Sequence, residues 1–433
     1  MEPTPYQGEL SLDGSVVPVT FRGGINLHGE LVLDIDPIPV NDRSRFIETN
    51  WDRDPARFVH FDLTGIAEDN TRFETSDLFF TTLGTLGFFN QPLQPKAQCS
   101  TATISWKLKQ PVERPLLRTR VKAFRTFHAD ITCALGQVAM AGQHTIENDD
   151  FVTGSFDIEA SSQPSDLTQW REQAGRLLKH VCRVMSFASS TILRSPLQEF
   201  YNDEMAIISY QSQSRTSLSG YPIIHFHDNK VAFNAAVRSF FDPPMPGSDL
   251  YFAIEWLSME ASYNEVRLVT AMTALENLLD ANLNENDAYI VSGGEFNKMR
   301  RALRHFIRKC LADLPIAEEV TSELNENLAQ FNRRSFLRKL KRLSMQWQVP
   351  LDGISDDMLI AAKRARDYVV HRGKYYEGVE EEPLDLWRHV AVIREIAARF
   401  LMVAIGYTGR YQTYIGAPRD AMFPPATSQA QTK

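Results

Sequence analysis

The sequence predicts an α+β multidomain protein with a β-sandwich-like N-terminal domain, a mixed middle region and an all-α C-terminal helical bundle. Three features of the 433-residue chain support this prediction. Before about residue 160, apolar and polar residues alternate over short segments, as they do in half-buried strands. After about residue 165, the apolar spacing becomes helical. A Pro-rich break at 242–247 then precedes a region in which the apolar patterns are helical throughout.

The β-rich N-terminal domain is predicted over 1–160. Apolar residues occupy alternate positions in the segments 31–35, 59–63 and 102–108. Breaks rich in Gly and Asp separate these segments, which is typical of a sandwich or a barrel. We expect one face of each strand to lie against a core and the other face to lie in water.

The middle region is predicted over 161–245 and mixes helix with strand. Apolar residues from Trp170 to Met185 follow a 3.6-residue period, and Asp166 is placed to cap this helix at its N-terminus. The other predicted elements of this region are strand-like segments at 206–210 and 221–226 and a helix at 232–241.

The helical bundle is predicted over 246–415. Its apolar spacing and its breaks define helices over about 252–282, 295–314, 317–330, 334–346, 356–372 and 383–407. The broad apolar stripe of the first of these helices suits the bundle core, a dimer contact or both. The last residues, 416–433, are rich in Pro, Ala, Ser and Gln, and we expect them to be disordered.

Composition argues against several classes of protein. The four Cys have neither zinc-ligand nor redox-motif spacing, so we expect reduced thiols and a cytoplasmic protein. The first residues lack the pattern of a secretory signal, and no apolar run is long enough to span a membrane. The net charge of −8, taken alone, argues against a nucleic-acid partner.

No motif indicates a cofactor. The sequence has neither a P-loop nor a dinucleotide fingerprint, so we expect no nucleotide cofactor. His225 and His227 would share one face of a strand, but no other His or Cys lies near them in the sequence. We therefore favour packed side chains over a metal site there, and we expect no obligatory metal.

A candidate catalytic set lies at the end of the predicted 356–372 helix. His371 falls in the last helical turn, and Gly373 follows at a position where helices commonly end. The C-terminus of a helix is its negative pole and favours the imidazolium form, so His371 is a credible proton donor or acceptor. Asp367 lies four residues earlier on the same face and is placed to orient the ring.

Arg366 adds a permanently charged, forked group that suits phosphate. An Arg, a His and an orienting carboxylate supply what metal-free cleavage of RNA needs. A base activates the 2′-hydroxyl, an acid protonates the leaving 5′-oxygen, and a cation stabilises the charge that develops on phosphorus. On spacing alone, however, a surface arginine followed by a capping histidine is the preferred interpretation of Arg366 and His371.

The segment 366–371 resembles the motif of HEPN-superfamily ribonucleases, in which an Arg, a polar residue and three variable residues precede a His. The segment 273–279, Thr-Ala-Leu-Glu-Asn-Leu-Leu, looks like the ALExLL segment of Apea-like HEPN domains. Such domains accompany abortive-infection and anti-phage proteins, often behind a β-rich N-terminal domain. The resemblance covers roughly 250–410 and implies an HEPN-like helical bundle.

This resemblance implies that Arg366 and His371 are the catalytic pair, that Asp367 is the polar motif residue and that Glu276 is the acidic partner of the arginine. It also implies an active site at a homodimer interface, where two Arg/His pairs face one cleft. Two pairs offer a base, an acid and two phosphate clamps. From the residues alone, Glu276 fits equally well at the edge of the core.

The negative total charge conceals a basic segment. Residues 295–345 contain twelve Lys and Arg against six Asp and Glu, so this segment carries +6 and the rest of the chain −14. The resulting basic helix faces either track phosphates or are solvated faces paired with nearby Glu. The candidate RNA-binding residues are Arg338, Arg342, Lys363, Arg364, Arg372, Lys374 and Tyr375. Tyr375 and its neighbour Tyr376 either stack on unpaired bases or pack on the last helix.

These observations predict a metal-independent endoribonuclease whose products carry a 2′,3′-cyclic phosphate and a 5′-hydroxyl. The resemblance implies a toxic effector of anti-phage, abortive-infection defence. It also implies a homodimer or larger homo-oligomer held through the helical domain and a phage or cellular trigger at the N-terminal domain, with no membrane partner. The alternative is a non-catalytic HEPN-type module that dimerises and binds RNA or protein.

Overall fold

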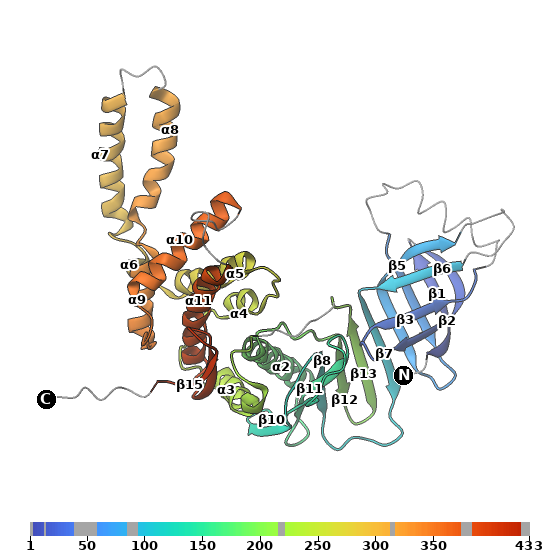
Figure 1. Cartoon of the computed structure of the whole chain (residues 1–433). Coiled ribbons are helices and arrows are strands. Elements are labelled where there is room, and N and C mark those ends of the chain that lie inside the picture. Colours follow the sequence, from blue (N-terminus) through green and yellow to red (C-terminus); the bar gives the residue numbers. More distant parts are fainter. Residues whose placement is uncertain are drawn as a thin grey trace. The chain divides into compact units, whose positions relative to one another are not determined.

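The chain divides into two compact units. The first consists of 1–221 and 225–240, and the second of 222–224 and 241–433. The computed structural model describes residues 3–12, 14–38, 59–84, 94–214, 221–311, 317–373 and 383–425. An antiparallel sheet dominates the first unit and helices dominate the second, which confirms the predicted α+β class at this level (Figure 1).

One antiparallel sheet runs through the first unit. Its strands are β1 (Thr4–Leu12), β2 (Ser15–Ile25), β3 (Leu31–Ile35), β4 (Phe61–Ile66), β5 (Arg72–Gly84), β6 (Gln94–Cys99), β7 (Thr101–Lys107), β8 (Leu116–Lys122), β9 (Ala129–Cys133), β10 (Gly136–Ala141), β11 (Val152–Glu159), β12 (Leu197–Tyr201) and β13 (Met205–Gln211). Their order is β3-β2-β1-β4-β5-β7-β13-β12-β8-β11-β10-β9, with β6 paired to β5. The predicted sandwich is therefore replaced by one continuous sheet. β13 pairs with β7 and β12 pairs with β8, so these two strands join the earlier and later parts of the sheet.

The strand order also changes the predicted division of the chain. Residues 161–245, expected to form a separate middle region, supply two central strands of the sheet and belong almost entirely to the first unit. A region whose strands complete the hydrogen bonding of two earlier strands has no separate core to form. The division between the two units, near residue 241, lies close to the predicted start of the helical bundle.

The beginning of the sheet curls until β3 and β6 lie against each other. It encloses a core of aliphatic and aromatic side chains. Tyr6, Phe21 and Phe73 form an aromatic cluster there, with ring centroids 5.0 to 5.8 Å apart. The alternation at 31–35 corresponds to β3, and the other two predicted strands correspond to β4 and β7 with shifts of one to three residues.

Two helices complete the first unit. α2 (Leu167–Ser189) packs against β8 and β11. α3 (Asn229–Phe241) comes after the last strand of the sheet in the sequence. As predicted, Asp166 caps α2, since its side chain accepts a 2.9 Å hydrogen bond from the Gln169 backbone N–H. The strand predicted at 221–226 is wrong, because turns and the short 3₁₀ helix η1 (Phe226–Asp228) occupy this segment.

His225 and His227 lie at this 3₁₀ helix. Their rings stack with centroids 4.7 Å apart. Across the ranges that the structure describes, no three His, Cys, Asp or Glu side chains gather in a way that would hold a metal ion.

The stability of the first unit is expected to fall in mild acid. His180 in α2 is buried, and its Nε2 lies 3.1 Å from Ser239 Oγ in α3. Burial lowers the pKa of His180 to about 4. An unfolded histidine has a pKa of about 6.5. Below that pH, His180 is protonated in the unfolded chain but stays neutral in the folded chain until the pH approaches 4. Stability from this group is complete above about pH 6.5 and declines by about 3 kcal/mol as the pH falls to about 4.

Urea unfolding of the wild type and of His180→Gln, measured across this pH range, tests the prediction. Glutamine has no proton to gain, so the variant should show a flatter decline. An equally steep decline in both proteins would assign the acid sensitivity to other groups.

The second unit is a helical bundle. Its main helices are α4 (Tyr251–Ser258), α5 (Asn264–Asn282), α9 (Phe336–Trp347), α10 (Asp356–Arg372) and α11 (Pro383–Ala404), with the short α6 (Glu285–Ala288) between α5 and the hairpin described below. α5 packs against α4, α9, α10 and α11 and is therefore the central helix. Among the described residues, no helix is both long enough and apolar enough to cross a bilayer.

The single long helix predicted over 252–282 is wrong, because the chain breaks between α4 and α5. Met259 and Tyr263 adopt extended backbone conformations on either side of the break. Arg267 holds the connection by donating a 2.9 Å hydrogen bond from Nε to the Ala261 carbonyl. Phe252, Met259 and Tyr263, three apolar positions of the predicted stripe, are exposed.

A helical hairpin extends from this bundle. It consists of α7 (Gly293–Leu311) and α8 (Ala317–Asn327), followed by the 3₁₀ helix η2 (Leu328–Asn332). Figure 1 shows the two helices side by side, beyond α6 and α9. α7 packs against α8 and η2, and Phe296 is its one buried residue.

The prediction of disorder over 416–433 is wrong for the part of this segment that the structure describes. β14 (Gly409–Thr413) and β15 (Arg419–Phe423) form an antiparallel hairpin, and Phe423 is buried against Tyr411. This apolar contact and the hairpin hydrogen bonds order a segment that its composition alone marks as a tail. Residues 426–433 lie outside the described residues.

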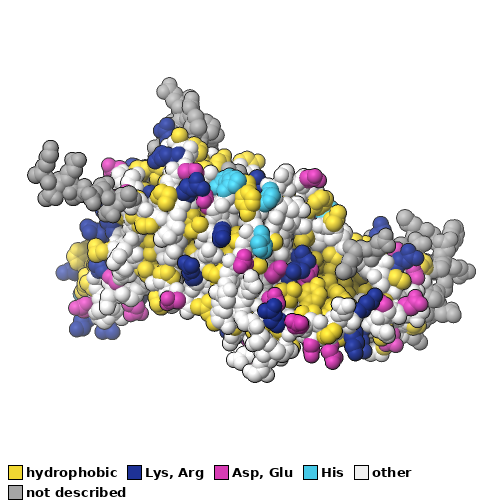
Figure 2. Space-filling model, turned by 90° about the horizontal axis from the view of Figure 1, so that it is seen from below, with side chains coloured by type: hydrophobic (Ala, Val, Ile, Leu, Met, Phe, Trp, Pro, Cys, Tyr) yellow, Lys and Arg dark blue, Asp and Glu magenta, His cyan; other side chains and the backbone are white. Residues whose placement is uncertain are grey.

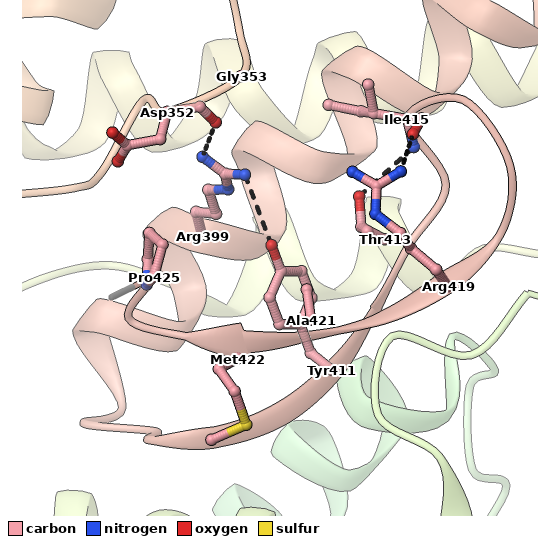
Figure 3. A pocket seen from close by; sticks show the side chains of 10 residues that line it. All are labelled: Asp352, Gly353, Arg399, Tyr411, Thr413, Ile415, Arg419, Ala421, Met422 and Pro425. Atoms are coloured by element: carbon pink, nitrogen blue, oxygen red, sulfur yellow. Dashed lines mark hydrogen bonds between the residues drawn. The ribbon is translucent and has the colours of Figure 1, made fainter. Parts of the chain in front are cut away.

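A buried polar network fastens the hairpin to α11 (Figure 3). Arg399 donates to Glu395 Oε1 at 2.9 Å and to the carbonyls of Pro350 and Asp352 at 3.0 and 2.9 Å. The Tyr411 hydroxyl donates to the same Glu395 oxygen at 2.6 Å, and burial together with this carboxylate raises the pKa of Tyr411 to about 12. A pocket of about 260 Å³ lies beside the network, but the Arg399 donors that face it are already occupied.

Candidate active site

Local signals define the helix that carries the motif. The Ser355 side chain caps α10 by accepting a 3.2 Å hydrogen bond from the Met358 backbone N–H. At the other end, Gly373 adopts φ +71°, and its N–H donates to the Val369 carbonyl at 2.8 Å. This left-handed position favours glycine. The observed helix, Asp356–Arg372, has the predicted bounds.

Arg366 is held by two carboxylates. One terminal guanidinium nitrogen lies 2.7 Å from Glu276 Oε2, and the other lies 3.2 Å from Asp367 Oδ1. Glu276 comes from α5, so this ion pair joins the two helices that the motif residues occupy. Of the two positions that the sequence left open for Glu276, the structure therefore shows the one in contact with Arg366. The Arg366 Nε is buried and has no hydrogen-bond partner in the described part of the chain.

Asp367 does not orient His371, which corrects the prediction from their spacing. Its carboxylate instead binds Lys363 Nζ at 2.6 Å and Arg366 at 3.2 Å. No hydrogen bond between Asp367 and His371 is present among the described residues. Partial burial raises the pKa of Asp367, but the hydrogen bonds and charges of Lys363 and Arg366 outweigh burial, and the pKa lies below its ordinary value.

His371 is exposed in the last turn of α10. Its position at the negative pole of the helix agrees with the sequence prediction. Two apolar side chains of the same helix are also exposed, Val370 at 52% and Ile360 at 45%. α10 thus carries an exposed imidazole, a guanidinium held by two carboxylates and two exposed apolar side chains.

The predicted RNA-binding residues have different surroundings. Arg364 and Arg338 are exposed, and the Arg372 guanidinium lies 4.6 Å from the centre of the Tyr368 ring. Lys363 and Arg342 are engaged in ion pairs, with Asp367 and Asp287 respectively. Lys374 and Tyr375, together with Tyr376, lie outside the described residues.

The basic face predicted on α9 is partly neutralised. Lys339 pairs with Asp280 and Lys341 with Asp356, each at 2.5 Å. On the face seen in Figure 2, Lys and Arg are interspersed with Asp and Glu. Part of this segment is therefore a set of paired surface charges, and Arg338 is its exposed predicted contact.

Sequence reasoning missed the Lys363–Asp367 pair. The signal was present, because residues four apart on a helix are neighbours and opposite charges there attract. Both Lys363 and His371 are four residues from Asp367, and the lysine is the one that binds it.

The fold and the site together define a β-rich unit followed by a helical bundle that carries an Arg–carboxylate ion pair and an exposed histidine. Comparison of the chain with protein-family models, with curated proteins and with solved structures finds no significant match.

Proposed function

We propose that the chain is an HEPN-type endoribonuclease that cleaves RNA without a metal ion. The carrying observation is that α5 and α10 bring Glu276 against Arg366, on the helix whose negative pole bears the exposed His371. The ion pair fixes the guanidinium in a fork suited to a phosphodiester. The exposed imidazole of His371 is accessible to a substrate for proton transfer.

In the proposed reaction, His371 removes the proton of the 2′-hydroxyl, and the 2′-oxygen attacks phosphorus. A bond forms between O2′ and phosphorus, and the bond from phosphorus to O5′ breaks. An imidazolium donates the proton that the departing O5′ needs. Arg366 stabilises the negative charge on the phosphoryl oxygens. The products are a 2′,3′-cyclic phosphate and a 5′-hydroxyl.

The carboxylates have a second effect in this proposal. Glu276 and Asp367 position Arg366, but they also offset its charge until an RNA phosphate competes for the guanidinium. Such competition restrains binding of unsuitable anions, which suits an intracellular nuclease that must be held in check.

A second copy of the chain is expected to complete the site. One imidazole cannot conveniently act on both sides of an in-line displacement, whereas two copies supply a base and an acid. The exposed Val370 within the motif and Ile360 further along α10 are suited to being covered by that copy. We propose a homodimer or larger homo-oligomer formed through the helical unit.

The proposed role is that of a cytoplasmic toxic effector in abortive-infection defence against phage. The first unit would recognise a phage or cellular trigger and restrain the nuclease until it arrives. This role rests on the resemblance of the motif and of the domain order, not on the chemistry of the site.

A ribose substitution tests the reaction. RNA should be cleaved in EDTA, and a single 2′-deoxynucleotide at the cleaved position should abolish cleavage there because the nucleophile is missing. End analysis should find cyclic phosphate and 5′-hydroxyl termini. The RNA ends made on expression of the wild type, compared with those made by Arg366→Ala, identify the substrate. Cleavage at the deoxy position, or complete loss of activity in EDTA, would contradict the mechanism.

A non-catalytic RNA- or protein-binding module is the second candidate. The observation that favours it is the pairing of Arg366 with two carboxylates, which is also a stable structural arrangement. The same assay distinguishes the two candidates when phage lysates or cell extracts are added as sources of the trigger. RNA binding without cleavage under all of these conditions would support the binding module.

A further inference from the structure

The α7–α8 hairpin exposes an apolar stripe. Met299, Leu303 and Phe306 recur at helical spacing along α7, and they are 51%, 37% and 63% exposed. Cys310, one turn further along the same stripe, is also exposed. Residues at positions i, i+4, i+7 and i+11 line one side of a helix, so these four form a single strip.

The hairpin itself does not cover this strip. The least exposed apolar side chains of α7 are Phe296, which is buried, and Ile307, which is half-buried. A pair of helices that buries so little has little to offset the entropy of ordering it. An amphipathic helix of this kind is stabilised by a further packing partner, and the apolar strip offers the surface for one.

Charge identifies the partner. The α7 sequence contains six Lys and Arg and one Glu, whereas the α8 sequence contains four Glu and neither Lys nor Arg. A second hairpin of the same chain therefore presents an acidic helix to this basic helix, and the reverse pairing is equivalent by symmetry. Leu324 of α8 is 40% exposed and supplies an apolar contact for the strip.

We propose that the α7–α8 hairpins of two copies pack together as a four-helix arrangement, with the basic α7 of one copy against the acidic α8 of the other. This surface is distinct from α10 and the Arg366 site. The hairpin contact does not depend on any ribonuclease activity, and its test reads assembly instead of cleavage.

The test measures the molar mass of the full chain by light scattering and sedimentation over a concentration series. Phe306→Glu places a charge in the strip and should weaken self-association by about a hundredfold. At concentrations where the wild type is assembled, the measured molar mass of the variant should fall to half. Asn297→Glu adds the same charge to an exposed position on another side of α7 and should weaken association less than about threefold. A chain that stays monomeric, or an assembly that Phe306→Glu leaves unchanged, would overturn the proposal.

Two further readouts separate this pairing from other occupants of the strip. Added salt screens opposite charges, so it should weaken an α7–α8 contact between copies, whereas it would strengthen a contact between two basic α7 helices. Maleimide should label Cys310 more slowly in the assembly than in Phe306→Glu. Strengthening by salt, or a loss of RNA binding in Phe306→Glu with unchanged mass, would instead assign the strip to a different contact.

Discussion

Replacing His371 with alanine is expected to reduce RNA cleavage by about a thousandfold while leaving the protein folded. General acid–base catalysis by a positioned side chain contributes roughly 10² to 10⁴ in rate, and alanine removes it. Because the His371 side chain is exposed, little packing is lost. The measurement is the single-turnover cleavage rate of a fixed RNA by both proteins.

A matched control is available in the same unit. His305 is an exposed histidine of α7, away from the motif, and His305→Ala should retain the wild-type rate. Unchanged cleavage by His371→Ala would refute the assignment of this residue as base or acid. Equal losses in the two variants would point to a general effect on folding or assembly.

Removing one member of the buried pair in α11 is expected to be the most destabilising single change we describe. Glu395 and Arg399 are both almost fully buried, with 3% and 8% of their side chains exposed. Arg399→Met leaves a carboxylate buried without its counter-charge and two carbonyls without their donor. Breaking such a pair costs about 3–5 kcal/mol. Urea unfolding should show this loss in the transition of the second unit.

The double variant Glu395→Leu/Arg399→Met distinguishes the pair from simple packing. With both charges gone, the loss should be smaller than the sum of the two single losses by about 1–3 kcal/mol. Arg176 and Glu172 form an exposed pair with the same spacing, and Arg176→Met should cost less than about 1 kcal/mol. Additive losses in α11 would show that the charges are not coupled.

Prediction from the sequence succeeds where the signals are local. The bounds of α10 follow from its apolar spacing and Gly373, and the cap of α2 from Asp166. The same local reasoning fails at the break between α4 and α5. The apolar spacing runs through it without Pro or Gly, and a hydrogen bond from Arg267 to the Ala261 carbonyl accompanies the interruption.

The site shows the same division. Whether Arg366 meets Glu276 depends on how α5 packs against α10. The spacing of residues within one helix carries no information about that packing. The resemblance supplied that pairing, and the structure shows it as an ion pair. The error at Asp367 has a different origin, because two candidate partners are equally near along the helix and their relative strength decides between them.

The strand order has a consequence for the making of the protein. Ribosomes deliver β7 and β8 well before β12 and β13, the strands that lie between them. Until residue 211 has emerged, β7 and β8 each leave an edge of the nascent sheet unpaired, and each such edge is a template for association with another chain. The first unit therefore completes its sheet late in its own synthesis, but still before α10, the helix that bears Arg366 and His371, leaves the ribosome.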